Sequence, residues 1–125
     1  MEHVFCFEDE PDIQEVARLS LEAVGGFRVD TAGSGAEGLA LLETLTPDVI
    51  LLDVMMPGMD GPSVLRELRK NPRTALIPVI FMTAKVQPGE VDGYKKLGAA
   101  DVIPKPFDPV LLPDKIRSIL SRAPL

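Results

Sequence analysis

The chain has 125 residues, of which 46% are hydrophobic and 26% charged, as expected for one soluble globular domain that buries roughly two thirds of its unfolded surface. Its 19 acidic and 13 basic residues give a formal net charge of -6, which argues against direct binding to DNA or RNA. No secretory signal or membrane-length apolar run is present, and the lone Cys6 suits a reducing compartment, so we expect a single cytoplasmic domain over 1–125.

The first half of the chain alternates between strand-like and helix-like segments. His3–Phe7 is a short apolar run that ends at the acids 8–10, which predicts a buried strand followed by a turn. Apolar residues then recur at helical spacing over 13–24 and stop at two glycines. A second strand is predicted at 27–32 and a second helix at 35–45.

The second half of the chain repeats the same alternation. The predicted elements are strand 48–53, helix 62–70, strand 78–83, a weak helix 89–97, strand 101–103 and a last helix within 108–121. Asp108 and Pro109 suit the start of that helix, but Pro113 lacks an N–H, so the helix starts late or is kinked. Five such alternations predict an α/β fold, a doubly wound parallel sheet with helices on both faces.

Polar residues follow four of the predicted strands. Glu8 and Asp9 follow the first, Asp53 ends the third, Thr83 ends the fourth and Lys105 follows the fifth. Because parallel strands direct their carboxyl ends to one edge of the sheet, we expect these side chains to meet there. Carboxylates brought together repel each other and favour a hard divalent cation, for which Mg²⁺ is the natural choice.

This grouping also suggests a reaction. Asp53 would act as a carboxylate nucleophile that forms an acyl phosphate, and Lys105 and Thr83 would hold the phosphoryl oxygens. Each residue has a simpler explanation when taken alone: acids at a helix N-terminus, a turn cap, a β-branched strand residue and a solvated lysine. Their joint arrival at four strand ends favours the common site.

The same residues stand in motifs that resemble a known family. Acids 8–10 follow the first strand, and Asp53 precedes Met-Pro and Met-Asp-Gly within the loop 53–61; the other motifs are Met82-Thr83-Ala84, Gly98-Ala99 and Lys105-Pro106-Phe107. Together they resemble the receiver domain of two-component response regulators over nearly the whole chain. The resemblance implies a flavodoxin-like fold with strand order 2-1-3-4-5.

The resemblance also implies a mechanism. Asp53 would be phosphorylated by a histidine kinase or a histidine phosphotransfer protein. Mg²⁺ would be held by Asp9, Asp53 and the backbone carbonyl of Met55, with Glu8 acting mainly through water. Lys105 and Thr83 would contact the phosphoryl group, and the peptide bond before Pro106 would be cis.

Phosphorylation would then switch the face formed by the fourth helix, the fifth strand and the fifth helix. That face would bind a downstream output domain or protein, or a second copy of the chain. The protein would thus be a signalling switch that catalyses its own phosphorylation and dephosphorylation, and not a metabolic enzyme. The sequence is compatible with a stand-alone regulator and with part of a longer protein.

Three positions near the predicted site depart from a common pattern or vary in the family. An aromatic residue often stands three positions before the lysine, where this chain has Val102. Switching would then rely on movement of the loops after Thr83 and Asp53 or on Tyr94, or it would be weak. Met55 and Lys85 occupy the positions two after Asp53 and Thr83 that in the family tune the lifetime of the acyl phosphate.

Three rival readings remain. Residues 33–38 match G-x-G-x-x-G, which suggests a dinucleotide-binding module, although a turn and N-cap before the second helix would also explain them. A phosphatase that forms an aspartyl phosphate would carry a second aspartate where this chain has Met55. The third interpretation is a degenerate receiver that serves only as a binding surface, and the absence of an aromatic residue at Val102 is compatible with it.

Overall fold

The computed structural model describes residues 2–122, which form a five-stranded parallel sheet in the order β2-β1-β3-β4-β5. The predicted fold class and strand order are therefore confirmed. The strands are β1 His3–Phe7, β2 Arg28–Ala32, β3 Val49–Asp53, β4 Val79–Thr83 and β5 Asp101–Pro104. The helices are α1 Pro11–Leu19 with a π-helical extension η1 Ser20–Val24, α2 Gly35–Leu41, α3 Gly61–Lys70, α4 Pro88–Lys96 and α5 Leu112–Arg122.

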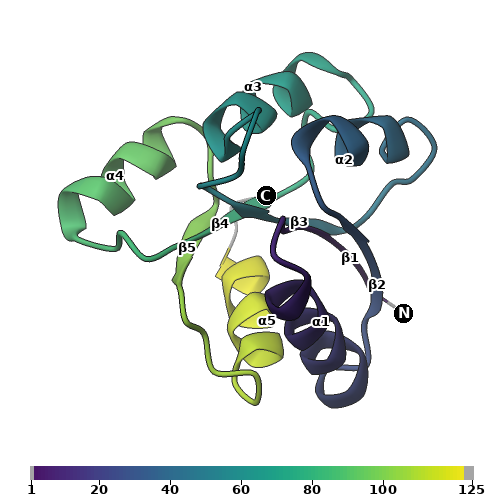
Figure 1. The fold of residues 1–125 in the computed structure, drawn as a ribbon. Coiled ribbons are helices and arrows are strands. Elements are labelled where there is room, and N and C mark those ends of the chain that lie inside the picture. The colour runs from purple at the N-terminus through teal and green to yellow at the C-terminus, as the bar shows by residue number, and fades with distance from the viewer. Residues whose placement is uncertain (1, 123–125) are drawn as a thin grey trace.

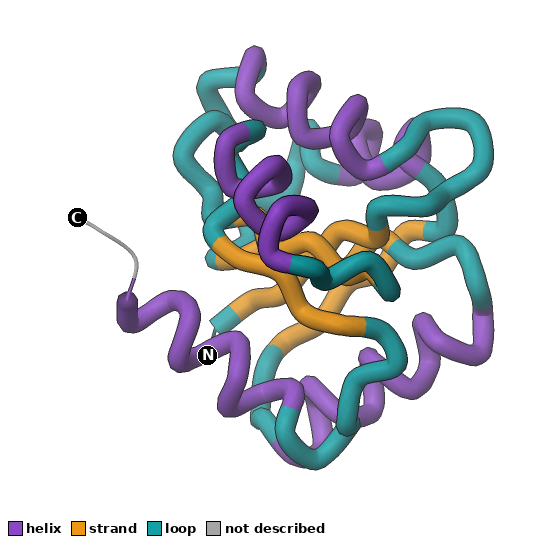
Figure 2. Tube along the Cα trace, turned by 90° about the vertical axis from the view of Figure 1, so that its left-hand side faces the viewer, coloured by secondary structure: helices purple, strands orange, loops and turns teal. Residues whose placement is uncertain are grey.

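The helices form a layer on each side of the sheet. Helices α1 and α5 cover one face, and α2, α3 and α4 cover the other (Figure 1). The second view shows the strands enclosed between these two layers (Figure 2). Right-handed crossovers between parallel strands place successive helices in this way.

The central strands divide their side chains between the two layers. In β1, Val4 and Cys6 pack with α1 and α5, whereas Phe5 and Phe7 pack with α2 and α3. All residues of β1, β3 and β4 are buried, which explains why these segments read as continuous apolar runs and not as alternating ones. Burial raises the pKa of the Cys6 thiol to about 12, so this cysteine stays protonated and serves as core.

Several predicted helix boundaries differ from the structure. The first helix begins at Pro11, and its last turn, η1, is π-helical rather than α-helical. The second helix ends at Leu41, and residues 42–44 form a turn, although Leu42 and Leu45 still pack on the core. A helix end depends on the last turn's local hydrogen bonds, which the apolar pattern does not determine.

The last helix starts late, as Pro113 suggested. Asp108 does not cap it; its carboxylate accepts a hydrogen bond from the Val110 N–H at 2.9 Å within a turn. Helix α5 then begins at Leu112, which places Pro113 in the first turn, where a missing N–H costs little. The helix continues to Arg122, one residue beyond the predicted range.

The glycine motif at 33–38 is explained by the start of α2. Ser34 is the N-cap, and its hydroxyl accepts a hydrogen bond from the Glu37 N–H at 3.1 Å. The Glu37 carboxylate accepts in turn from the Gly33 N–H at 2.6 Å. A Cβ at Gly38 would collide with the Phe7 ring, so close packing of α2 on β1 requires glycine there. These contacts favour the turn and N-cap reading over the dinucleotide reading.

Among residues 2–122, no helix is both long enough and apolar enough to cross a membrane.

Candidate functional site

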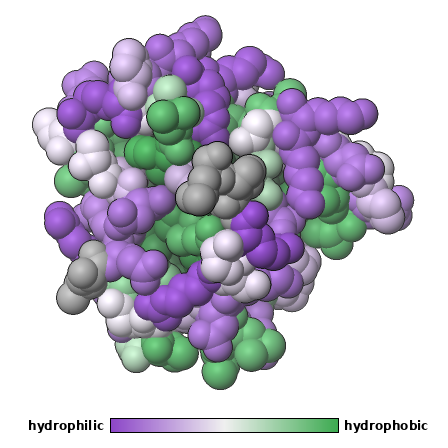
Figure 3. Space-filling model, turned by 180° about the vertical axis from the view of Figure 1, so that it is seen from behind, coloured by the Kyte–Doolittle hydropathy of each residue, from purple (hydrophilic) through white to green (hydrophobic). Residues whose placement is uncertain are grey.

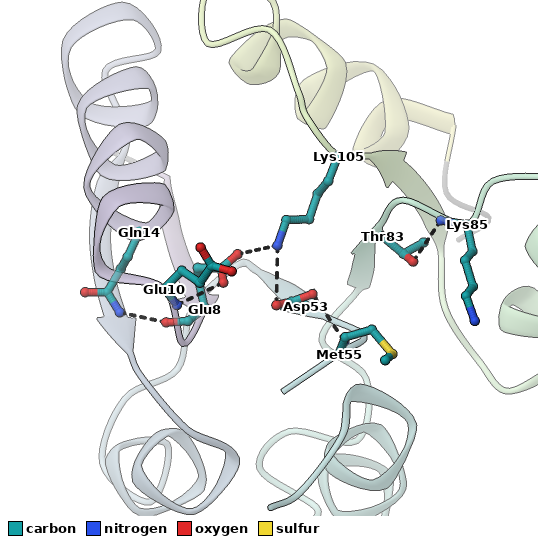
Figure 4. Close-up of polar contacts among 8 residues, drawn as sticks. All are labelled: Glu8, Glu10, Gln14, Asp53, Met55, Thr83, Lys85 and Lys105. Carbon is teal, nitrogen blue, oxygen red and sulfur yellow. Dashed lines mark hydrogen bonds and ion pairs between the residues drawn. The ribbon is translucent and has the colours of Figure 1, made fainter. Parts of the chain in front are cut away.

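The ends of β1, β3, β4 and β5 bring the predicted residues to one edge of the sheet. The pairings Phe7 with Leu52, Asp53 with Met82, and Thr83 with Pro104 align the four strand ends. Carboxylate oxygens of Glu8, Asp9 and Asp53 all lie within 4.8 Å of one another. Lys105 extends from the end of β5 toward Glu8 and Asp53 (Figure 4). The structure therefore brings Glu8, Asp9, Asp53 and Lys105 together at the edge where the sequence placed them.

Lys105 bridges two of the carboxylates. Its Nζ lies 2.8 Å from Oε1 of Glu8 and 3.4 Å from Oδ2 of Asp53. Glu8 is fully buried, and its other oxygen accepts a hydrogen bond from the Glu10 N–H at 3.2 Å. Burial by itself lowers the pKa of Lys105, but the hydrogen bond to Glu8 and the charges of both carboxylates outweigh it and raise that pKa. Lys105 therefore stays protonated beside the two acids.

The pKa of the Asp53 carboxyl is raised, whereas a salt bridge ordinarily lowers the pKa of an acid. Burial, followed by the negative charge of Glu8, raises the pKa of Asp53 to about 6. Lys105 and the Met55 N–H, which donates to Oδ1 at 3.2 Å, offset this in part. Asp53 is thus ionised at neutral pH but held in an unfavourable environment, which an added positive charge would relieve.

The loop after β3 folds back, so that its last residue, Gly61, contacts the backbone next to Asp53. The Gly61 N–H donates to the Val54 carbonyl at 2.9 Å. A Cβ on Gly61 would lie 2.8 Å from the carbonyl oxygen of Asp53, so this approach requires glycine. Asp60 N-caps α3 by accepting from the Ser63 N–H at 2.9 Å. These contacts give a physical role to the Asp-Gly pair of the loop 53–61.

Thr83 ends β4 beside this cluster. It is buried, and its Oγ1 accepts a hydrogen bond from the Lys85 N–H at 3.1 Å (Figure 4). The backbone carbonyl of Thr83 accepts from the Lys105 N–H at 3.0 Å, which ties the two strand ends together. The peptide bond between Lys105 and Pro106 is cis, as expected.

Two contacts at the site were not predicted. The Gln14 side chain donates to the backbone carbonyl of Glu8 at 3.0 Å and so ties α1 to the end of β1. The Glu8–Lys105 pair is the other, because Glu8 was expected to act mainly through water. Neither contact has a sequence signal, since each joins residues through the folded arrangement of separate elements.

We expect replacement of Lys105 by Met to lower the free energy of unfolding by about 3 kcal/mol, because it leaves the buried Glu8 carboxylate without its partner. The double variant Glu8→Gln/Lys105→Met should recover most of this loss, since both charges are removed together. Urea unfolding monitored by circular dichroism measures both values. An unchanged midpoint for Lys105→Met would show that the pair does not stabilise the fold.

Comparisons with known proteins agree with this geometry. Residues 4–117 match the sequence family described as "Response regulator receiver domain". The chain is 37% identical over 123 residues to the DNA-binding dual master transcriptional regulator RpaA of Synechocystis sp., covering 98% of this chain and 50% of that protein. It is 40% identical over 122 residues to the transcriptional regulatory protein AfsQ1 of Streptomyces coelicolor, covering 98% and 52%.

Solved structures show the same fold. The chemotaxis response regulator CheY4 of Vibrio cholerae superposes with a TM-score of 0.89 at 28% identity, covering 95% of this chain and 98% of that one. The chain spans about half the length of the curated relatives named above. Family model, relatives and fold agree: the chain belongs to the response regulator receiver domains of two-component signal transduction, a family of signalling switches that are phosphorylated on aspartate.

Proposed function

We propose that Asp53 is the residue that accepts the phosphoryl group in this receiver, with Lys105 and Thr83 as the residues that contact it. The observation that carries this proposal is the bridging of Glu8 and Asp53 by Lys105, in a cluster where three carboxylates lie within 4.8 Å. Asp53 ends a fully buried strand, and the structure holds its carboxylate in place through the Met55 N–H.

The transfer is a displacement at phosphorus. A carboxylate oxygen of Asp53 forms a bond to the phosphorus, and the bond from phosphorus to the donor breaks, leaving a neutral histidine or a small carboxylate. The Lys105 ammonium and the Thr83 hydroxyl donate hydrogen bonds to the phosphoryl oxygens as charge builds there. Because the pKa of Asp53 is about 6, the nucleophilic carboxylate is available at neutral pH.

The donor set fits a magnesium ion. Three carboxylates against one ammonium leave two negative charges uncompensated, and carboxylate oxygens are the ligands that Mg²⁺ prefers. Asp9 and Asp53, with the Met55 carbonyl, would hold the ion, and Glu8 would contribute its charge while paired with Lys105. When bound, the ion would neutralise charge on the carboxylates and on the incoming phosphoryl group.

We propose that the phosphoryl donor, a histidine kinase or histidine phosphotransfer protein, docks over α1 and the segment between β5 and α5. A cavity of about 420 Å³ lies there, lined by Asp12, Ile13, Val16, Lys105, Pro106 and Phe107, so Lys105 belongs both to this surface and to the site. Exposed apolar residues continue it, namely Leu19, Val24, Val110 and Leu111. Seen from behind, small groups of hydrophobic residues lie along the lower rim of the molecule (Figure 3).

We propose that residues 1–125 act as a single cytoplasmic receiver and that its switched face, α4, β5 and α5, binds an output domain or protein or a second copy of the chain. RpaA is a DNA-binding regulator, but the net charge of -6 leads us to assign no nucleic-acid contact to this chain itself. We assign it a switching role and no metabolic reaction.

The direct test is the intact mass of the protein after incubation with acetyl phosphate, with Mg²⁺ or with EDTA. The proposal expects a gain of one phosphoryl group that requires Mg²⁺. No gain in a protein shown to be folded would instead favour the degenerate binding module.

A further inference from the structure

The segment between β1 and α1 carries two of the three acids of the carboxylate cluster, Glu8 and Asp9. Strand β1 ends at Phe7 and helix α1 begins at Pro11, so residues 8–10 belong to neither element. The last bond of this segment to the sheet is made by the Glu8 N–H, which donates to a carbonyl of β2 at 3.0 Å. The direction of the next side chain, that of Asp9, is therefore not set by the sheet.

Gln14 connects this segment to helix α1. Its side-chain amide donates to the backbone carbonyl of Glu8 at 3.0 Å (Figure 4). Its backbone N–H donates to the Glu10 carbonyl at 2.9 Å. Glu10 is the N-cap residue of α1 but makes no side-chain bond to the helix. The Gln14 amide thus takes the place of a neighbouring strand as the partner of the Glu8 carbonyl.

The two acids of this segment are held in different ways. The Glu8 carboxylate is buried, pairs with Lys105 at 2.8 Å and accepts from the Glu10 N–H at 3.2 Å. Within residues 2–122, no hydrogen bond or ion pair holds the Asp9 carboxylate itself. The position of the Asp9 carboxylate therefore depends on the backbone that precedes it.

The carbonyl that Gln14 holds belongs to the peptide bond between the two acids. Because a peptide unit is planar and rigid, fixing the Glu8 carbonyl also fixes the direction in which the chain enters Asp9. Rotation of this unit would carry the Asp9 side chain away from Asp53, while the ion pair with Lys105 would keep the Glu8 side chain in place. The Gln14 bond opposes that rotation.

Magnesium is sensitive to such a rotation. The ion requires nearly ideal octahedral geometry, so a ligand that points in the wrong direction contributes little. Groups that orient a metal ligand without touching the metal typically change its affinity by about 10- to 100-fold when they are removed. Gln14 is uncharged and half-buried, and it contacts the peptide bond next to Asp9, which suits such a role.

We propose that Gln14 is a positioning residue for the magnesium site and acts on Asp9 through the peptide bond between Glu8 and Asp9. This inference rests on the proposed role of Asp9 as a ligand of the ion. Without the Gln14 bond, the peptide unit rotates more freely, and the Asp9 carboxylate spends less time near Asp53. Binding of Mg²⁺ then weakens, although every acid of the cluster is still present.

A Mg²⁺ titration of the unphosphorylated protein tests this role, with the amide NMR shifts of residues 53–55 as the readout. Gln14→Met keeps a side chain of similar length and good helix propensity but has no donor for the Glu8 carbonyl. Its Kd for Mg²⁺ is expected to be about tenfold higher than that of the wild type. The same spectra report whether the variant is folded. A Kd within about twofold of the wild-type value in the folded variant would overturn the proposal.

The double variant Asp9→Asn/Gln14→Met tests the route through Asp9. If Gln14 acts by orienting the Asp9 carboxylate, its replacement should have no further effect once that carboxylate is gone. The double variant should therefore bind Mg²⁺ as weakly as Asp9→Asn alone. Additive losses of affinity would show that Gln14 acts through another group and would overturn the assignment.

Thr31→Val is the matched control. It removes the bond that Arg18 of α1 donates to the Thr31 hydroxyl at 2.9 Å, which is another tie between α1 and a strand, without a change in charge. Its Kd for Mg²⁺ should match the wild type. An equal loss of affinity in Thr31→Val and Gln14→Met would mean that any loosening of α1 weakens the site, and would overturn a specific role for Gln14.

Intact mass after acetyl phosphate treatment separates this inference from the proposed function. A wild type that gains the phosphoryl group, together with an unchanged Kd in Gln14→Met, overturns the positioning role and leaves the proposed function standing. A folded wild type that gains no phosphoryl group counts against the proposed function instead. A wild type that binds no Mg²⁺ overturns the proposed metal site and the role of Gln14 together.

Discussion

Asp53→Asn is expected to take up no phosphoryl group from acetyl phosphate at any Mg²⁺ concentration. The amide is a far weaker nucleophile than the carboxylate, so the bond to phosphorus does not form. Its oxygen can still accept from the Met55 N–H, so the loop that follows β3 should keep its shape. Intact mass measured beside the wild-type protein reports the loss, and a stable adduct on the variant would place the acceptor at another residue.

The same variant should be more stable than the wild type at neutral pH when no divalent ion is added. The folded protein raises the pKa of Asp53 from 3.8 to about 6, so the fold favours the protonated acid. That contribution to stability is complete below pH 3.8 and is lost as the pH rises through 6. At pH 7.5 the ionised Asp53 therefore destabilises the wild type by about 1–3 kcal/mol relative to the amide.

Urea unfolding at several pH values measures this difference. The gap between Asp53→Asn and the wild type should be largest near pH 7.5 and should shrink toward pH 4. A gap that widens on acidification would mean that Asp53 is stabilised as the carboxylate in the fold. Such a result would mean that Lys105 lowers the pKa of Asp53 by more than burial and the charge of Glu8 raise it.

Asp9→Asn is expected to weaken Mg²⁺ binding by at least about tenfold and to slow phosphorylation at low Mg²⁺ to the same extent. Asp9 is half-buried and supplies one of the three carboxylates of the cluster. Its replacement by asparagine removes one of the negative charges that would attract the ion. Because an ion that binds the folded state raises its stability, Mg²⁺ should raise the melting temperature of the wild type and have a smaller effect on this variant.

Glu10→Gln is the matched control for Asp9→Asn. It removes one acid of the same run, but Glu10 is exposed and lies outside the carboxylate cluster. Its Mg²⁺ dependence should match the wild type. If Asp9→Asn kept the wild-type response to Mg²⁺ in both melting and phosphorylation, the ion would have to be held without Asp9.

Pattern alone was enough to place the strands. The run 3–7 is followed directly by the acids 8–10, and the runs 48–53 and 78–83 end at Asp53 and Thr83. Each of the three contains a buried strand. Helix ends were less predictable. The π-helical last turn at 20–24 and the early end of α2 depend on local hydrogen bonds rather than on apolar spacing, whereas Pro113 did indicate the late start of α5.

The members of the site follow from chain order. In a parallel sheet all strands present their carboxyl ends at one edge, so the residues after each strand can be assigned to that edge without coordinates. Glu8, Asp9, Asp53, Thr83 and Lys105 were identified in this way, and the structure places the acids and Lys105 in one cluster, with Thr83 beside it. The motifs of the family added the expected cis bond before Pro106, which is present.

The tertiary structure decided which of these groups pair and how each helix is held. The bond between Lys105 and Glu8, the raised pKa of Asp53 and the Gln14 contact depend on distances between elements far apart in the chain. The anchoring of α4 through Tyr94 likewise depends on packing against β4. Sequence periodicity reports which side of an element is buried, but pair distances and desolvation arise only when separate elements come together.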